Sequence, residues 1–319
     1  MGDVFVVTEH LQGELTDASF EAVGTARSLA SDTGGQVVVA VVGSGVADMA
    51  SQLGGADRIL VVDDPALEVF NPDGHARVFT ALAEGHDIVV VPYTSVGMDV
   101  ASDMAVRSGR PLVSFCTAVS AGGRLGATCQ LYAGKIEADV VVDGTQAIFA
   151  VLSGSGDAAA GRSGGAGNVE VVENPADLSD LAVECLGVAE PEAGDVDITA
   201  QDVLVVVGRG IESEDNIEEA QELADALGGA LAASRPIVDQ GWLPKTRQVG
   251  KSGLTVKPRV YLTLGVSGAP EHVEGMKDAG TIIAVNTDPQ APIFGVADYG
   301  WVGDLFDLLP ELIDLVESD

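Results

Sequence analysis

Val203-Leu204-Val205-Val206-Val207-Gly208-Arg209-Gly210 is the stretch that decides the fold of the C-terminal part of this sequence. Five consecutive apolar residues predict a strand buried on both faces, as in a parallel sheet. The glycine turn leads into a helical pattern over 214–227 whose first turn is rich in Glu and Asp, as helix N-termini favour. Further strands are expected at Ala230–Ala233, Val260–Leu264 and 281–285, and an amphipathic segment at 301–316 ends the chain. This alternation predicts a Rossmann-like α/β domain.

The first 190 residues alternate in the same way. Strands are expected at Val4–Val7, 36–42, 59–62, 88–91 and 112–115, and helices at 20–31, 46–53, 76–83 and 98–107.

Three further stretches shape the domain prediction. Segments broken by glycines between 118 and 151 predict a hairpin-like antiparallel extension. The Gly-, Ala- and Ser-rich stretch 153–167 is interpreted as a mobile loop, and a Pro/Gly/Asp-rich stretch at 189–200 as the domain boundary. We therefore expect two α/β domains: residues 1–195 with a mostly parallel sheet and an antiparallel extension, and residues 196–319 with a Rossmann-like fold.

The chain is strongly acidic throughout, with a net charge of −33. Residues 1–190 carry −18 and residues 191–319 carry −15, and Lys (5) is scarcer than Arg (11). This spread favours a hydrated surface suited to high salt over an acidic docking face, because a docking face would concentrate its charge. Nucleic acid is excluded as a partner, since binding phosphates requires the opposite sign.

Cysteine usage and hydropathy indicate a cytoplasmic protein. Cys116, Cys129 and Cys185 lie far apart with no C-x-x-C, which argues against a metal knuckle, a redox dithiol or a disulfide scaffold. The N-terminus lacks the basic region of a signal peptide. No apolar run approaches the roughly 20 residues that span a bilayer, so no membrane insertion is expected.

Several polar, glycine-rich segments follow or face the predicted C-terminal strands. They are Gly208-Arg209-Gly210, Ser234-Arg235, Gln248-Val249-Gly250-Lys251-Ser252-Gly253, Gly265-Val266-Ser267-Gly268-Ala269, Glu271-His272 and Asn286-Thr287-Asp288-Pro289. Because the carboxyl ends of parallel strands meet at one edge of a sheet, the segments predict a long, phosphate-bearing cofactor there. The window 245–259, with five cations and no acid, favours a bound anion or an acidic partner surface over a solvated basic loop.

Two other motifs are incomplete. Gly43-Ser44-Gly45 lacks the third glycine of a dinucleotide fingerprint, because Asp48 stands there, and Gly250-Lys251-Ser252 lacks the first glycine of a P-loop, which Lys245 replaces. No metalloprotease helix, nucleophile elbow or evident acid–base pair occurs in the sequence. The sequence thus favours a carrier of a reactive cofactor over an enzyme with its own substrate, with no catalytic residues.

In their order, these motifs resemble the α subunit of electron transfer flavoprotein. The resemblance covers most of residues 203–319 and rests on Gly208-Arg209-Gly210-Ile211, Ala233-Ser234-Arg235, Val238-Asp239, Gly241-Trp242, Gln248-Val249-Gly250, Gly265-Val266-Ser267-Gly268-Ala269, His272, Gly275-Met276-Lys277-Asp278, Asn286-Thr287-Asp288-Pro289, Ala291-Pro292-Ile293-Phe294 and Val296-Ala297-Asp298-Tyr299-Gly300. Residues 1–190 are similar more loosely, chiefly through strand order and Leu131-Tyr132-Ala133-Gly134.

The resemblance implies an electron carrier: a heterodimer with a β subunit, with one FAD held mainly in the C-terminal domain and the first domain packed on the partner. Such a subunit passes single electrons from flavin dehydrogenases, such as the acyl-CoA dehydrogenases of fatty acid β-oxidation, toward the membrane quinone pool through a quinone oxidoreductase.

The resemblance also implies the cofactor-binding residues. They are Arg209, Ser234, Arg235, Gln248, Val249, Gly250, Lys251, Ser252, Ser267, Gly268, Ala269, Pro270, Glu271, His272, Asn286, Asp304 and Leu305. Arg235 would lie over the isoalloxazine, His272 would reach its C2 carbonyl oxygen, and the Ser252 hydroxyl would lie near N5. Three residues depart from the family pattern: Ser252 replaces Thr, Glu271 replaces Gln and adds a negative charge, and Val207 replaces Gly.

Two other classes of protein stay open at this point. One is an NAD-binding, doubly wound enzyme subunit with its own substrate, which would be colourless where a flavoprotein is yellow. The other is a nucleotide-sensing scaffold that holds only an adenine nucleotide. The mass of the ligand released by heat separates these classes. The choice between simple transfer and electron bifurcation depends on the β subunit.

Overall fold

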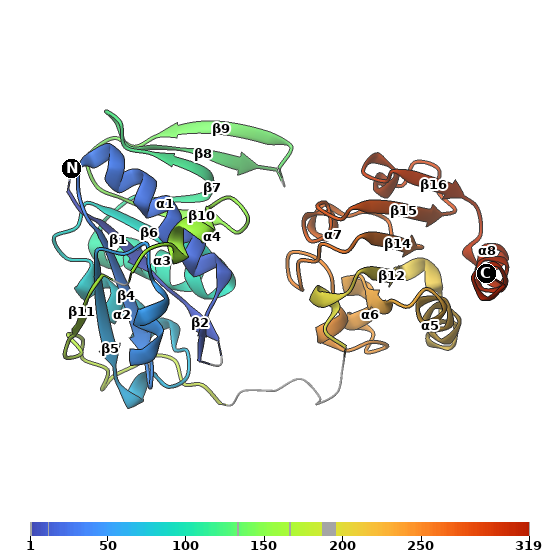
Figure 1. The fold of residues 1–319 in the computed structure, drawn as a ribbon, viewed down its shortest axis with the longest axis horizontal. Helices are drawn as coiled ribbons and strands as arrows, with labels where there is room; N and C mark the ends of the chain where they lie inside the picture. Colours follow the sequence, from blue (N-terminus) through green and yellow to red (C-terminus); the bar gives the residue numbers. More distant parts are fainter. Residues whose placement is uncertain (1, 12, 133, 166, 187–195, 319) are drawn as a thin grey trace. The chain divides into compact units, whose positions relative to one another are not determined.

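The computed structural model describes residues 2–11, 13–132, 134–165, 167–186 and 196–318. The chain divides into two compact units, Met1–Val188 and Ala189–Asp319. Each unit has its own sheet and its own hydrophobic cores (Figure 1). The prediction of a two-domain α/β protein is confirmed, while the expected boundary at 195 lies outside the described residues.

The first unit is built on a nine-stranded sheet. In spatial order its strands are β11 (Asn168–Val171), β5 (Arg58–Asp63), β4 (Val37–Gly43), β1 (Val4–Val7), β6 (Ile88–Tyr93), β10 (Ala147–Leu152), β7 (Leu112–Ser120), β8 (Gly126–Leu131) and β9 (Ile136–Val141). Pairing is parallel from β11 to β7 and antiparallel from β7 through β8 to β9. The expected antiparallel extension is therefore present.

Helices cover both faces of this sheet, so its central strands are apolar at every position. In β1, Val4 and Val6 pack in a core shared with α1 (Asp17–Thr33), while Phe5 and Val7 pack in a core shared with α2 (Pro72–Leu82) and α3 (Ser95–Ser108). The expected helix at 46–53 is a 3-10 helix, η1 (Ala47–Gln52). The remaining short elements are η2 (Pro65–Leu67) and the paired strands β2 (His10–Leu11) and β3 (Glu14–Leu15).

The hairpin-like interpretation of 118–151 is wrong for its last segment. β10 does not pair with β9 but lies parallel between β6 and β7. Its six residues, Ala147–Leu152, are all buried. A strand that is apolar at every position is suited to the covered centre of a sheet, which explains why it leaves the exposed hairpin.

The interpretation of 153–167 as a mobile loop is also wrong over part of its length. Helix α4 (Ala158–Arg162) forms there and packs on α1. A Cβ on Gly161 would lie 2.1 Å from the Phe20 carbonyl oxygen, and one on Gly24 would lie 2.1 Å from the Asp157 carbonyl oxygen. The small residues serve close packing of backbone on backbone.

The second unit has a five-stranded, all-parallel sheet in the order β13-β12-β14-β15-β16. The strands are β12 (Val203–Val207), β13 (Ala230–Ala233), β14 (Val260–Leu264), β15 (Thr281–Asn286) and β16 (Tyr299–Val302). In chain order this is 2-1-3-4-5, the arrangement of flavodoxin-like doubly wound domains. The Rossmann-like prediction is thus confirmed at the level of the fold class.

Helices α5 (Ile217–Ala226) and α8 (Leu305–Glu317) share one core on this sheet. The expected helix 214–227 begins as a 3-10 turn, η5 (Glu214–Asn216), and the expected terminal segment 301–316 divides between β16 and α8. The other helices are η3 (Ile198–Ala200), η4 (Arg209–Ile211), α6 (Arg235–Asp239), η6 (Lys245–Arg247), α7 (Pro270–Glu274) and η7 (Pro292–Gly295).

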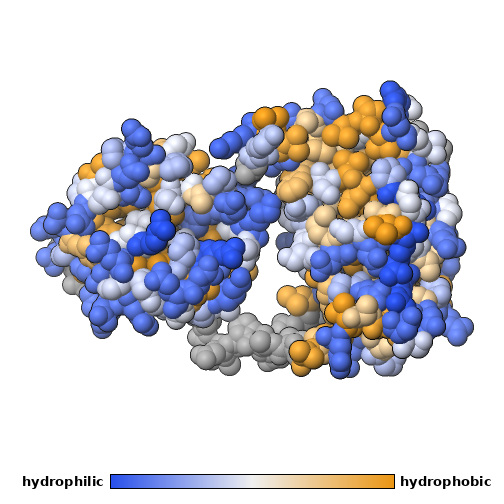
Figure 2. All heavy atoms as spheres, turned by 180° about the vertical axis from the view of Figure 1, so that it is seen from behind, coloured by the Kyte–Doolittle hydropathy of each residue, from blue (hydrophilic) through white to orange (hydrophobic). Residues whose placement is uncertain are grey.

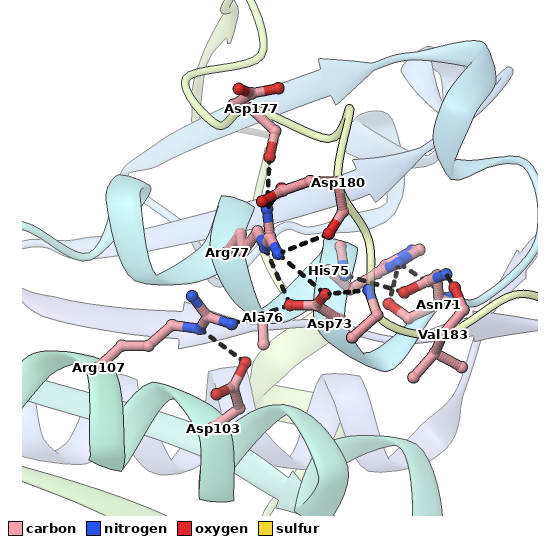
Figure 3. Close-up of polar contacts among 12 residues, drawn as sticks. Asn71, Asp73, His75, Ala76, Arg77, Asp103, Arg107, Asp177, Asp180 and Val183 are labelled. Carbon is pink, nitrogen blue, oxygen red and sulfur yellow. Dashed lines mark hydrogen bonds and ion pairs between the residues drawn. The ribbon is translucent and has the colours of Figure 1, made fainter.

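After β11, the chain returns across α2, where an ion-pair network holds it (Figure 3). Arg77 donates to both oxygens of Asp73, at 2.9 and 3.0 Å, and to the carboxylate of Asp180. Asp73 also accepts from Arg107 at 2.8 Å and from the backbone N–H of Ala182 at 2.9 Å. Chiefly through the bond from Arg77, the pKa of Asp73 is held below its ordinary value.

Asp73→Asn is expected to loosen this returning segment, because it removes a largely buried charge that satisfies two arginines and a backbone amide. We expect the first unit to lose about 1–3 kcal/mol of stability and residues 177–183 to exchange amide hydrogens faster. Urea unfolding and hydrogen exchange measure these effects. The control is Asp143→Asn, whose carboxylate is 98% exposed and pairs with Arg124; its effect should stay below about 0.5 kcal/mol. Equal effects of the two variants would contradict the account.

Candidate functional site

The candidate site lies where the strand order of the second sheet reverses. From β12 the chain goes first to β13 on one side and then to β14 on the other. Gly208 follows β12 and Gly265 follows β14, so both lie at the carboxyl edge of the switch point. Ligands of open α/β sheets bind in the crevice at such a point.

Glycines let the two loops at this point touch. Gly210 N–H donates to the Gly265 carbonyl at 3.1 Å. A Cβ on Gly208 would lie 2.4 Å from the same carbonyl, and one on Gly210 would lie 2.7 Å from Gly265 Cα. Gly265 itself has a φ of +66°, a conformation that other residues rarely adopt. The residue before them, Val207, is fully buried in the core shared with α5, so its departure from the family pattern does not alter the loop surface.

Two arginines follow the neighbouring strands β12 and β13. Arg209 is exposed in η4, and Arg235 is exposed at the first position of α6, directly after the buried Ser234. Arg235 Nε pairs with Asp239 at 3.3 Å, and the Arg235 side chain is 67% exposed. Ion pairs this exposed contribute little, so the guanidinium keeps the freedom to turn toward a ligand.

The loop 248–254 is hydrogen-bonded both to the end of β13 and to the start of α7. Val249 N–H donates to the Ala233 carbonyl at 2.9 Å, and Lys251 N–H donates to the Glu271 carbonyl at 2.7 Å. Gly250, at a φ of +133°, lies between these two anchors. The structure thus brings together three segments that lie apart in the sequence.

Within this loop, Gln248 is buried and Ser252 is exposed. Gln248 Nε2 donates to Ser252 Oγ at 2.9 Å. The other amide atom, Oε1, is buried without a hydrogen-bond partner in the described part of the chain.

His272 points into the interior and is only 6% exposed. Its Nε2 lies 2.9 Å from the hydroxyl of Tyr261, a fully buried residue of β14. Burial lowers the pKa of His272 to about 4, against a smaller opposite effect of the Val249 backbone. The imidazole is therefore neutral at pH 7, and Nδ1 makes no hydrogen bond of good geometry among the described residues.

The turn after β14 carries the next predicted residues. Ser267 accepts from Ile293 N–H at 3.1 Å, and a Cβ on Gly268 would lie 2.3 Å from that nitrogen. Ala269 and Pro270 follow, exposed, and lead into α7. Glu271 is exposed at the second position of α7, where its carboxylate meets solvent.

The last three predicted residues are used within the protein. Asn286 donates to the Val266 carbonyl at 2.9 Å and accepts from a backbone N–H two residues later, so it ties the ends of β14 and β15 together. Asp304 caps α8. Leu305 is buried in the core beneath that helix, which leaves its backbone, and not its side chain, to face a ligand.

The five cations of 245–259 are not gathered at one edge of the sheet. Arg247 Nη1 donates to the Leu231 carbonyl at 2.8 Å, and Lys251 Nζ lies 3.7 Å from Glu274. Lys257 and Arg259 precede β14, at the edge opposite Gly265. The window therefore divides between the candidate site and the far side of the sheet.

Sequence reasoning missed Tyr261 as the partner of His272. The available signal was a tyrosine inside the otherwise apolar run Val260–Leu264. A buried phenol requires a partner, but the sequence does not tell which residue supplies it.

A doubly wound domain with glycine loops at its switch point, and with arginines directly after two neighbouring strands, is typical of a nucleotide-type cofactor-binding protein. Comparison with known proteins specifies the family. The electron transfer flavoprotein domain matches residues 4–177, and the electron transfer flavoprotein FAD-binding domain matches residues 197–277. The chain belongs to the electron transfer flavoprotein α-subunit family, a family of redox carriers, and its cofactor is FAD.

Relatives match over nearly the full chain. The electron transfer flavoprotein α subunit of Thermoanaerobacterium thermosaccharolyticum is 35% identical over 99% of this chain and 98% of its own length. That of Bacillus subtilis is 34% identical over 98% and 96%. A subunit of the lactate dehydrogenase (NAD(+),ferredoxin) of Acetobacterium woodii is 32% identical over 99% of this chain and 77% of its own length.

The residues around the switch point fit a bound FAD. The close glycine loops leave backbone groups within reach of a ligand, and two buried polar atoms, Gln248 Oε1 and His272 Nδ1, lack partners of good geometry within the described residues. Unpaired buried polar groups are rare in folded proteins, and a cofactor with many donors and acceptors can satisfy them.

None of the helices in the described ranges has the length and hydrophobicity to cross a membrane.

We expect His272 to stay neutral down to about pH 5 in the folded chain. An unfolded histidine binds a proton near pH 6.5, whereas the pKa of folded His272 is about 4. The unfolded state therefore binds more protons, and stability falls as the pH drops from 6.5 toward 4. The loss between pH 7 and pH 5 should be about 2 kcal/mol.

Histidine NMR titration and urea unfolding of the second unit at both pH values measure these effects. In His272→Gln the loss should disappear from the second unit. It should persist in the first unit, where burial also lowers the pKa of His75 to about 4. An unchanged pH dependence of the second unit in His272→Gln would refute the assignment.

Proposed function

We propose that this chain is the FAD-carrying subunit of a heterodimer with an electron transfer flavoprotein β subunit. It takes electrons from flavin dehydrogenases, such as the acyl-CoA dehydrogenases of fatty acid β-oxidation, and passes them singly to a quinone oxidoreductase and the membrane quinone pool. The observation that carries the proposal is the position of Arg209 and Arg235, which directly follow the neighbouring strands β12 and β13 at the carboxyl edge of the sheet.

FAD supplies the one-electron chemistry, and the chain supplies fixed charge and hydrogen bonds. A positive charge 4 Å from a developing negative charge is worth roughly 4 kcal/mol at an effective dielectric constant of 20. Even a net 1.4 kcal/mol shifts a one-electron potential by about 59 mV. Arg235 is suited to this role because its ion pair with Asp239, at 3.3 Å and largely exposed, holds it only weakly at the surface.

The other expected contacts with FAD fall into two groups. Arg209, Ser234 and the loop Val249–Ser252 would bind the ribityl chain, phosphate and ring. The turn from Ser267 to His272, with Asn286, Asp304 and the backbone of Leu305, would extend the site toward the diphosphate and adenosine. His272, at the end of this turn, would reach the C2 carbonyl oxygen of the flavin through Nδ1, since Nε2 is held by Tyr261.

The first unit offers a surface for the β subunit. Strand β9 is the last strand of its sheet, and Ile136 and Val141 there are about half exposed, at 49% and 53%. Tyr132, in the connection before β9, is more exposed still. Figure 2 shows hydrophobic side chains gathered on the surface of this unit among hydrophilic ones. An exposed apolar edge of this kind favours burial against a partner.

The relatives' names leave the electron donor open. One is the electron transfer subunit β of an acryloyl-CoA reductase of Anaerotignum propionicum, 32% identical over 99% of this chain, and another belongs to a lactate dehydrogenase. The acyl-CoA dehydrogenase assignment therefore rests on the resemblance to the simple carriers of the family.

We also propose that the protein works at high salt. A net charge of −33 repels itself within a compact chain, and salt shortens the range of this repulsion from about 10 Å at 0.1 M to about 3 Å at 1 M. The thermal unfolding midpoint should rise by about 10 °C or more between 0.2 and 2 M KCl. A reference protein of near-neutral charge measured alongside should shift much less, and equal shifts would remove the argument.

The arginine role is tested with the heterodimer reconstituted with its cognate β subunit. The wild type should be yellow and release a ligand with the mass of FAD; NAD or an adenine nucleotide alone would refute the proposed function. Arg235→Ala should keep most of the FAD but lower the potential of the first reduction by roughly 30–90 mV, measured by dithionite titration against reference dyes. The matched control is Arg259→Ala, an exposed arginine at the opposite edge of the sheet, which should leave the potential unchanged.

A further inference from the structure

We propose that Gln248 is a positioning residue for Ser252: its side-chain amide holds the serine oxygen so that the hydroxyl hydrogen is free to donate to the bound flavin. This inference rests on the proposed FAD site. Gln248 Nε2 donates to Ser252 Oγ at 2.9 Å. The donor is 1% exposed and the acceptor lies at the surface of the loop, so an interior group orients an exterior one.

Hydrogen bonds fix the backbone of Gln248 on both sides, and on the N-terminal side its N–H donates to the Lys245 carbonyl at 3.1 Å. Its carbonyl accepts from Leu254 N–H at 2.7 Å, and the next residue, Val249, is bound to the end of β13. A Cβ on Gly253 would lie 2.3 Å from the Gln248 carbonyl oxygen and 3.0 Å from its Cγ, so the turn closes tightly around this side chain. The amide is thus held in place before any ligand binds.

Ser252 requires such a restraint. Serine has no second substituent on Cβ, and an exposed serine exchanges among three staggered rotamers. A hydroxyl that accepts a hydrogen bond retains its own hydrogen for another acceptor. The bond from Gln248 therefore both selects the rotamer and leaves the hydroxyl as a donor.

The alternative to this arrangement is the opposite orientation of the Gln248 amide, in which the remaining atom, Oε1, would face Ser252. Oε1 is buried without a hydrogen-bond partner in the described residues. If the amide were turned by 180°, Oε1 would accept the serine hydrogen, and Ser252 would have no hydrogen left for a ligand. The two orientations predict opposite effects of replacing the amide by a carboxylate.

The experiment uses the heterodimer in both Ser252 and Ser252→Thr backgrounds, with Gln248→Met and Gln248→Glu in each. In the Ser252 background, Gln248→Met should raise the FAD dissociation constant about five- to tenfold, as expected for one lost hydrogen bond. Threonine restricts its own rotamer through its methyl group, so in that background the same change should cost less than about twofold. Gln248→Glu should weaken binding at least as much as Gln248→Met, because a carboxylate accepts the hydroxyl hydrogen.

Two further readouts separate positioning from folding. Thermal unfolding of the FAD-free chain shows whether each variant folds. Side-chain couplings of selectively labelled Ser252 in the FAD-free protein should show one dominant rotamer in the wild type and averaging in Gln248→Met. If Gln248→Met unfolds, the comparison of Gln248→Glu with Gln248→Asn gives the same test.

The experiment distinguishes a failure of the proposed FAD site from a failure of the proposed role of Gln248. A wild-type protein that takes up no FAD refutes the FAD site itself. A wild type that binds FAD, with Gln248→Met equally harmful in both backgrounds or Gln248→Glu harmless, overturns only the role of Gln248. A single rotamer of Ser252 that persists in Gln248→Met would overturn it as well.

Discussion

The second unit depends on the backbone contact between the loops that follow β12 and β14. Because Gly210 and Gly265 touch without intervening side chains, peptide groups meet directly at the switch point. The other groups of the candidate site lie around this backbone contact. They are the arginines after β12 and β13, the loop 248–254, and the turn that leads into α7. A Cβ on Gly210 would lie 2.7 Å from Gly265 Cα, and one on Gly265 would lie 2.6 Å from Gly210 Cα, so either would force the two loops apart.

Around this contact the protein keeps polar groups in an interior made mostly of Val, Ala, Leu and Ile. Tyr261 and His272 satisfy each other, while Gln248 and His272 each retain a buried atom that lacks a partner of good geometry in the described residues. Such atoms reduce the stability of the unliganded chain. A ligand that reaches these atoms and bonds to them would remove this cost, so part of the lost stability would be recovered as binding affinity.

The sequence was sufficient for the long buried strands and for the order of the site loops, but not for the short or exposed strands β2, β3, β11 and β16. Apolar runs followed by glycine identify buried parallel strands, and parallel strands place their following loops at one edge. It was insufficient where tertiary contact decides. The local pattern of β10 predicts a hairpin strand, but in the folded sheet β10 takes a covered central position beside β6. Sequence spacing also does not predict the Tyr261–His272 pair or the Gln248–Ser252 bond.

The packing of α4 has a practical consequence for labelling experiments. The stretch around Gly161 has the composition of a flexible linker, yet added atoms there meet the backbone of α1 within 2.1 Å. In the turn between β7 and β8, an atom added at Gly122 meets nothing within 4 Å. A fluorophore or an affinity tag therefore belongs at that turn, and a dye placed in the small-residue stretch would report on damage to the first unit.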